Sequence, residues 1–261
     1  MILLSIVCVV KDDQAGLDRT LHSLIHSNEI EPEHLQEFEV VIVDGSESAI
    51  DPTNYDWNVN YLWEAPTGIY PAMNTGLRLA KGQYIYFLNA GDEIAAPETF
   101  NKLLNDLRDL ESNNPGCWLF GPIEIVSKTG GKTITPQWDY QKQKANLFSR
   151  GHFPSHQGTV MRVSQLRATG GFNVRFTVAA DYAAFLAISQ ISDPVIVDYP
   201  LARFFEGGTS TKQWKKAASE FHAARRQLLA PTGLDSIKER YFTAVTYTKE
   251  FIYREILSAR R

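Results

Sequence analysis

The segment Tyr84–Asp92 reads YIYFLNAGD, and it decides the fold that we expect for this chain. Its first five residues are apolar or aromatic, which is typical of a buried strand. The run stops at Asn89-Ala90-Gly91-Asp92, so an amide and a carboxylate follow directly where the strand ends. A glycine at such a turn allows the backbone to approach a ligand closely.

Two earlier apolar runs end in the same way. Leu3–Val10 is followed by Lys11-Asp12-Asp13, and Phe38–Val43 is followed by Asp44-Gly45-Ser46. A third short strand is expected over residues 61–63, and helical patterns cover residues 15–27, 71–80 and 97–110. This alternation predicts an α/β protein with a mostly parallel sheet and helices on both sides. Ligands bind beyond the carboxyl ends of such strands, so the polar ends are expected to form one site.

The second half of the chain is less regular. Strands are expected over residues 118–126, 132–135, 158–162 and 195–199, with a hairpin turn at Ser127–Gly131 and a helix over residues 182–190. From Lys212 the pattern is helical, with a break at Pro231-Thr232-Gly233. One domain with a helical tail is the simplest interpretation.

Composition excludes several classes of protein. The net charge of −4 gives no global basic field, so we expect no nucleic-acid partner. Cys8 and Cys117 lie in apolar runs without metal-type spacing, which favours reduced thiols in the cytoplasm. The run Ile2–Val10 lacks the flanks of a signal peptide and is too short to span a bilayer, so it is interpreted as a strand.

Two carboxylates at strand ends are candidates for ligand binding. Asp92 can bind Mg²⁺ or Mn²⁺ and through it a diphosphate, with Asn89 as a neutral oxygen ligand. The alternative is an acidic turn that caps the helix near Pro97. Asp44 can contact the imide edge of a uracil base, or it can form an Asx turn with the amides that follow it.

Three later segments are weaker candidates. Asp181 precedes an apolar helix and is either a general base or a helix N-cap. His152 and His156 can bind a metal, a phosphate or an acceptor hydroxyl, or they can be packed loop residues. Arg203 and the stretch Glu206–Ser210 can form a loop that closes over a phosphate, or an ordinary loop.

Taken together, these segments resemble glycosyltransferase family 2 and, more narrowly, its bacterial polysaccharide-assembly branch of colanic acid-type transferases. The matching motifs occur in order between Ser5 and Ser210. They are Ser5–Val7, Val43–Ser46, Glu64–Gly76, Ala80–Tyr84, Phe87–Asp92, Ser155–Gln157, Ala180–Tyr182 and Gly207–Ser210. The resemblance implies the GT-A fold, a single mostly parallel Rossmann-like sheet flanked by helices. It places a GT-A domain over residues 1–211, with a donor half to about residue 95, an acceptor half from about residue 96 to residue 211, and a C-terminal helical extension over 212–261.

The resemblance also implies a role for each matched position. Asp181 would be the catalytic base, and Asp92 would bind the divalent metal, Mn²⁺ or Mg²⁺. The donor-binding residues would be Asp12, Asp44, Gly68, Tyr70, Asn74, Asn89, Ala90 and Gly91. The residues near the acceptor or the diphosphate would be His156, Gln157, Arg203, Gly208 and Ser210. This sequence departs from the family pattern at Asn89 and Gly91, where many relatives carry carboxylates, at Thr67 and Pro71, and at Ser46-Glu47-Ser48.

The implied activity is inverting transfer of a hexose from a nucleotide-sugar, a UDP-sugar, to a hydroxyl of a lipid-linked oligosaccharide in surface polysaccharide biosynthesis. One alternative is a catalytically weak nucleotide-sugar-binding partner subunit. A nucleotidyltransferase is a second alternative, but Lys11–Gln14 does not supply the Gly-rich basic loop that it needs.

The tail Tyr241–Arg261 combines aromatic and basic residues in a helical pattern. Such a helix can lie on the inner face of the cytoplasmic membrane as a peripheral contact. The alternatives are a helix that packs on its own domain or on a second subunit of a homodimer.

Overall fold

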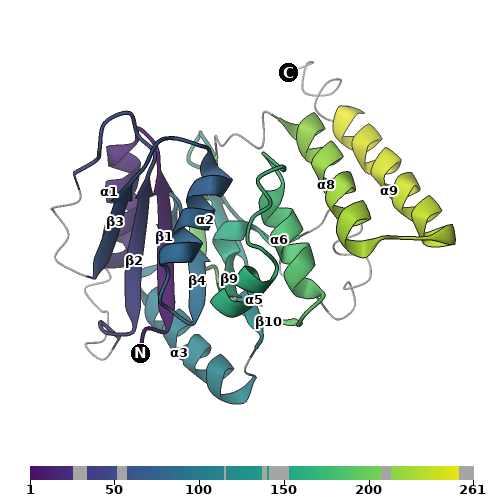
Figure 1. The fold of residues 1–261 in the computed structure, drawn as a ribbon. Helices are drawn as coiled ribbons and strands as arrows, with labels where there is room; N and C mark the ends of the chain where they lie inside the picture. Colours follow the sequence, from purple (N-terminus) through teal and green to yellow (C-terminus); the bar gives the residue numbers. More distant parts are fainter. Residues whose placement is uncertain are drawn as a thin grey trace.

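The computed structural model describes residues 1–25, 34–51, 58–114, 116–136, 140, 153–206 and 213–252. A seven-stranded sheet forms the centre and carries helices on both faces (Figure 1). Its strands lie in the order β10 (Pro194–Ile196), β6 (Trp118–Phe120), β9 (Thr159–Arg162), β4 (Tyr84–Phe87), β1 (Leu4–Val10), β2 (Phe38–Asp44) and β3 (Val59–Trp63). The arrangement confirms the α/β, GT-A-type fold class predicted from the sequence.

The direction of β9 determines which residues meet at the sheet edge. Strands β4, β1, β2 and β3 are parallel, whereas β9 runs antiparallel to β4 and to β6. The start of β9 therefore lies beside the end of β4, at the same edge of the sheet as the end of β1. A short 3-10 helix, η1 (His156–Gly158), comes directly before β9 and is placed at this edge.

A smaller four-stranded sheet was not predicted. It contains β5 (Glu93–Ile94), β11 (Ala202–Phe205), β7 (Ile123–Val126) and β8 (Lys132–Ile134). The expected strand over 118–126 divides at Gly121-Pro122, so that β6 belongs to the large sheet and β7 to the small one. Proline cannot donate to a strand ladder, and a Cβ at Gly121 would lie 2.6 Å from Val197 Cγ2. The hairpin between β7 and β8 is confirmed.

Alternating side chains of the central strands divide the core into two layers. Val7, Val41 and Phe87 face one layer with α2 (Ile69–Leu79), α5 (Val163–Ala168) and α6 (Ala180–Ser189). Ile6, Ile42 and Tyr86 face the other layer with α1 (Gln14–Ile25) and α3 (Pro97–Asn113). Because both faces are covered, these strands are apolar throughout, which is the pattern that identified them in the sequence.

The C-terminal helices α8 (Trp214–Leu229) and α9 (Gly233–Phe251) lie side by side at the end of the molecule far from β3 (Figure 1). Helix α8 packs on α6, where the Phe221 ring lies 4.7 Å from the Tyr182 ring and 5.3 Å from the Phe153 ring. Arg225 and Glu239 form a buried ion pair between α8 and α9. Among the described helices, none has the length and apolar character needed to cross a bilayer.

Close packing of α2 on β1 depends on Gly76. A Cβ at this position would lie 2.3 Å from Val7 Cγ1. We expect Gly76→Ala to destabilise the protein by about 1–3 kcal/mol through overpacking, even though alanine favours a helix by about 1 kcal/mol. Urea denaturation measures this change.

A double-mutant cycle with Val7→Ala tests the cause of the loss. Removing the Val7 methyl groups makes room for the added Cβ, so the double variant is expected to lose less than the sum of the single losses. Additive losses would show that the contact between Gly76 and Val7 is not responsible.

Candidate functional site

The turn after β4 presents Asp92 at the sheet edge. Gly91 has a φ of +95°, a conformation that glycine adopts readily and other residues rarely adopt. Its amide lies 3.0 Å from Thr20 Oγ1 of α1, and the Asp92 amide donates to Asn89 O at 2.9 Å. These contacts fix the turn and leave the Asp92 residue only 7% exposed.

His156 lies between Asp181 and the turn that carries Asn89 and Asp92. Its Nδ1 lies 3.7 Å from Asp181 Oδ2 in α6, and its Nε2 lies 3.2 Å from Asn89 Nδ2 in the turn after β4. The neighbouring Gln157 lies close enough to Asp92 to lower the pKa of its carboxyl. The structure thus brings Asn89, Asp92, His156, Gln157 and Asp181 together, as the predicted site requires.

The electrostatics of this cluster follow from its burial. Burial raises the pKa of Asp92 to about 6, although His156 and Gln157 partly oppose the rise. Burial by itself would lower the pKa of His156, but Asp181 and Asp92 outweigh that effect and raise it. The two carboxylates therefore make His156 easier to protonate than an ordinary histidine.

Tyr70 of α2 holds Asp181 from the other side. The Asp181 Oδ1 atom accepts from the Tyr182 amide at 2.8 Å and lies 3.2 Å from Tyr70 Oη. The Tyr70 hydroxyl also lies 2.9 Å from Val178 O. Burial and the nearby Asp181 carboxylate raise the pKa of Tyr70, so its phenol keeps its proton and acts as a donor.

Asp44 lies at the end of β2, where its carboxylate is fully buried. It accepts from the amides of Ser46 and Ile50 at 2.8 Å and from Tyr61 Oη at 2.7 Å. Burial would raise the pKa of Asp44, but these donors hold it below its usual value. The Asx turn is therefore formed, and direct contact between Asp44 and a base stays a prediction.

Asp12 connects the loops that follow β1 and β2. Its amide donates to Ser46 Oγ at 2.7 Å, and its Oδ1 accepts from the Glu47 amide at 3.0 Å. Its φ of +53° is uncommon for a residue with a side chain. Asp12 thus orders the edge of the sheet, while a contact with the donor stays a prediction.

Two predicted donor residues flank α2. Gly68 is exposed directly before the helix, with a φ of +115°. The Asn74 amide group is paired with the backbone of Phe172, donating to its carbonyl and accepting from its amide at 2.8 Å each. Asn74 therefore anchors the segment that leads to α6. Ala90 is half-buried against the core layer of α1 and α3.

Arg203 was expected in a loop with residues 206–210, and this placement is wrong. It lies in β11, where its guanidinium contacts Glu93 and Glu124 at 3.0 Å and the carbonyl of Ala95 at 2.9 Å. The small sheet, which the sequence pattern did not reveal, supplies these partners. His152, Gly208 and Ser210 lie outside the described residues.

Few side chains at the site could bind a divalent metal ion. Within the described residues, no group of three His, Cys, Asp or Glu side chains is arranged to hold a metal ion. Asn89 Oδ1 is buried and has no hydrogen-bond partner there. One carboxylate and one amide oxygen do not make an all-protein cage, but they fit Mg²⁺ or Mn²⁺ whose other ligands are phosphate oxygens and water.

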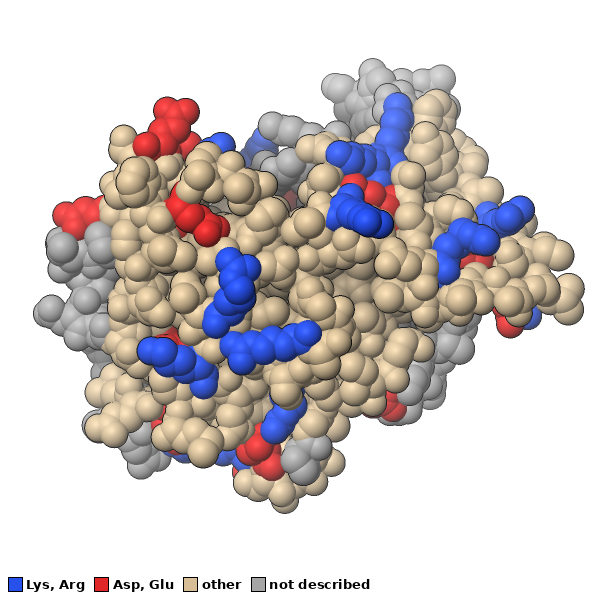
Figure 2. All heavy atoms as spheres, in the orientation of Figure 1, with Lys and Arg blue, Asp and Glu red and all other residues tan. Residues whose placement is uncertain are grey.

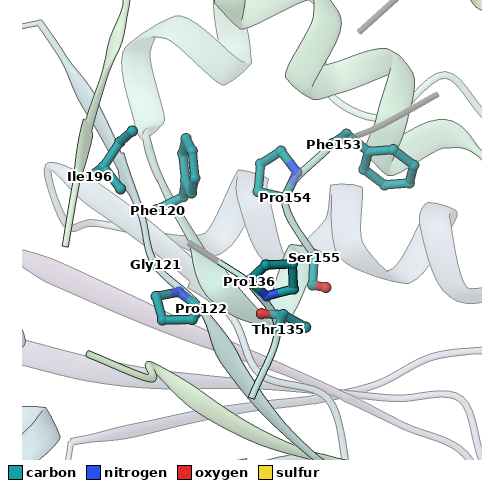
Figure 3. A pocket seen from close by; sticks show the side chains of 9 residues that line it. All are labelled: Phe120, Gly121, Pro122, Thr135, Pro136, Phe153, Pro154, Ser155 and Ile196. Carbon is teal, nitrogen blue, oxygen red and sulfur yellow. The ribbon is translucent and has the colours of Figure 1, made fainter. Parts of the chain in front are cut away.

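A hollow opens beside η1 at the same sheet edge (Figure 3). Phe120 and Ile196 come from the ends of β6 and β10, and Ser155 directly precedes His156. The full lining is Phe120, Gly121, Pro122, Thr135, Pro136, Phe153, Pro154, Ser155 and Ile196. Sequence patterns did not indicate it, because its walls come from separate segments without a shared motif.

The known sequences that are similar to this chain are glycosyltransferases. The profile of Glycosyl transferase family 2 matches residues 5–170. Two uncharacterized glycosyltransferases, from two strains of Mycobacterium tuberculosis, are each 23% identical over 217 residues, which is 79% of this chain and 76% of the relative.

Solved structures share the fold. S. aureus TarS 1-349 in complex with UDP-GlcNAc has a TM-score of 0.68 at 16% identity, covering 96% of this chain and 73% of that chain. This chain spans 44% of a longer TarS chain, with a TM-score of 0.67 and 15% identity over 96% of its own length. The Pyrobaculum calidifontis mannosyltransferase PcManGT, in complex with GDP-Man and Mn²⁺, has a TM-score of 0.58 at 14% identity. The match covers 95% of this chain and 74% of that chain. Since the family match covers more than half of the 261 residues, the chain belongs to glycosyl transferase family 2.

Proposed function

We propose that this chain is an inverting glycosyltransferase that moves a hexose from a UDP-sugar to a hydroxyl of a lipid-linked oligosaccharide, as in colanic acid-type polysaccharide assembly. One observation carries the proposal. Asp92 and Asp181 lie at the same sheet edge, where His156 contacts both Asp181 and the turn that carries Asp92. Such an edge is where α/β proteins bind ligands, and two carboxylates in different surroundings can serve different roles.

The donor is assigned to the side of the site formed by residues 1–95. The similar structures contain UDP-GlcNAc in one case and GDP-Man with Mn²⁺ in another, which supports a nucleotide-sugar. The proposed donor residues are Asp12, Asp44, Gly68, Tyr70, Asn74, Asn89, Ala90 and Gly91. Asp44 and Asp12 would act by ordering the loops that meet the base, since their side chains bond to those loops.

In the proposed reaction, Asp181 accepts the proton of the acceptor hydroxyl as that oxygen attacks the anomeric carbon. The bond from the anomeric carbon to the nucleoside diphosphate breaks, and attack from the opposite face inverts the configuration. Asp92 and Asn89 would hold the divalent metal, which when bound neutralises charge on the leaving diphosphate. His156 and Gln157 would lie beside the acceptor or the diphosphate, and His156 Nδ1 faces the Asp181 carboxylate.

The acceptor is assigned to residues 96–211. The hollow beside η1 supports this assignment, because its Ser155 adjoins His156 and its walls offer prolyl and aromatic surfaces (Figure 3). Gly208, Ser210 and Arg203 were predicted to assist the diphosphate. Arg203 would do so indirectly, by holding Glu93 next to Asp92.

The extension 212–261 is assigned to the membrane surface. Leu234, Ile237 and Tyr241 are 74%, 64% and 65% exposed along α9. Figure 2 shows several Lys and Arg side chains over the C-terminal helices on the face drawn there. Exposed apolar residues beside basic ones favour peripheral contact with an anionic bilayer.

Replacing Asp181 tests the catalytic proposal. We expect Asp181→Asn to lower turnover of a UDP-sugar by about 10²–10⁴-fold, because a general base is lost, with UDP affinity little changed. Release of UDP with and without Mn²⁺ measures turnover, and the exposed Asp198→Asn is the control. A fully active Asp181→Asn would exclude the base. A wild-type chain that binds nucleotide-sugars without turning them over would support the partner-subunit alternative.

Ionised Asp92 is expected to cost stability in the metal-free protein. Its pKa of about 6 exceeds the ordinary 3.8, so between these values the folded state holds a proton that the unfolded state has released. The free energy of unfolding therefore falls as pH rises through this range. We expect Asp92→Asn to be more stable than wild type at pH 7.5 by up to about 3 kcal/mol, and the difference to vanish near pH 4. Urea denaturation at both pH values with a chelator tests this, and equal stability at pH 7.5 would contradict it.

Membrane contact is tested with the triple variant Leu234→Ser, Ile237→Ser and Tyr241→Ser. We expect it to lose most co-sedimentation with vesicles that contain anionic lipid, because apolar burial drives this contact. Ile134→Ser, at a 57% exposed position on β8, is the control. Unchanged sedimentation would contradict the proposal, and a fall in the protein's mass in solution would instead assign the α9 face to a homodimer.

A further inference from the structure

Helix α6 carries Asp181 but begins without a cap from its own sequence. Its N-cap residue is Ala179, which has no side chain to accept a hydrogen bond. The segment directly before the helix, residues 177–179, is held by a residue from another helix. This residue is Glu220, which comes from α8.

Glu220 accepts four hydrogen bonds from the segment before α6. Its Oε1 accepts from the Thr177 amide at 3.0 Å and from Thr177 Oγ1 at 3.2 Å. Its Oε2 accepts from the amides of Val178 at 2.8 Å and Ala179 at 2.9 Å. The residue is buried, with 9% of its surface exposed. A carboxylate at a helix start is also favoured by the helix dipole.

The segment held by Glu220 also positions the side chain of Asp181. Val178 O and Asp181 Oδ1 lie within hydrogen-bonding distance of the same group, the Tyr70 hydroxyl. Movement of residues 177–179 would therefore change both the start of α6 and the place of this hydroxyl. Phe221, which follows Glu220, packs on Tyr182, which follows Asp181, and this contact holds α8 against α6.

We infer that Glu220 is a positioning residue for the catalytic base, and that α8 is part of the catalytic unit. This inference rests on the proposed role of Asp181. Glu220 lies in the C-terminal extension and acts through the backbone of residues 177–179. It orients the Asp181 carboxylate toward the acceptor hydroxyl and has no part in holding the donor.

The test is Glu220→Gln, which keeps the size of the side chain. Three of the four partners are backbone amides, which can only donate, and each carboxylate oxygen accepts from at least one of them. The new NH₂ group therefore cannot replace the oxygen at either position. We expect kcat to fall about 10–100-fold, because small errors in the position of a catalytic group are costly. UDP affinity and the KM for the UDP-sugar should stay within about twofold. Hydrogen exchange at the amides of residues 177–179 should become about tenfold faster.

Asp235→Asn on α9 is the matched control, since it removes the same charge from a position with a 76% exposed side chain. Glu220→Asp keeps the charge but is shorter, and is expected to be intermediate in kcat and in exchange; it serves as the measured variant if Glu220→Gln does not fold. Exchange and kcat equal to those of Asp235→Asn would overturn the inference. Faster exchange with unchanged kcat would also overturn it. An active Asp181→Asn would instead remove the proposed base, while the effect of Glu220 on exchange would remain.

Discussion

Strand β4 pairs with β1 in parallel on one side and with β9 in antiparallel on the other, and the site depends on this double pairing. The turn after β4 supplies Asp92, and His156 and Gln157 directly precede β9. Because β4 and β9 are antiparallel, the residues after β4 meet the residues before β9, although they are more than sixty positions apart in the sequence. The same pairing buries Tyr86 and Leu88 in the core next to this turn, so the surroundings of Asp92 are largely apolar.

Burial of the Asp92 carboxylate affects the pKa values in the site. Asp92 is less acidic than usual because water is excluded, and His156 is more basic because two carboxylates face it. The site therefore favours a compensating positive charge. An incoming cation or a diphosphate-bound metal would meet a single carboxylate and the unpaired Asn89 Oδ1, an arrangement suited to sharing the ion with the substrate.

Local sequence patterns predicted the elements of the first hundred residues because those strands are buried on both faces and their helices carry one apolar face. The limits of the predictions came from long-range contacts. The short strands β5 and β11 show almost no periodic pattern of apolar residues, and they are strands because they pair with each other and β11 also pairs with β7. For this reason, the sequence pattern placed Arg203 in a loop. The strand over 118–126 was divided by Gly121-Pro122, where close packing against Val197 matters more than strand propensity. At the site, motif order predicted Asp92, His156 and Asp181, whose roles stay predictions. It did not indicate that Asn74 bonds to Phe172, or that Glu220 binds the amides before α6, because neither contact has a local signature.

The long sequence separation of the Glu220 contacts bears on how the chain is made. The amides that it accepts precede it by 41 to 43 residues. During synthesis, the strands around the Asp92 turn are therefore complete well before the segment that leads into α6 receives this contact. We expect a nascent chain to order the Asp92 turn first, and the Asp181 side chain only when α8 has emerged and packed. The order of residues along the chain thus delays the completion of the site until α8 has been synthesised.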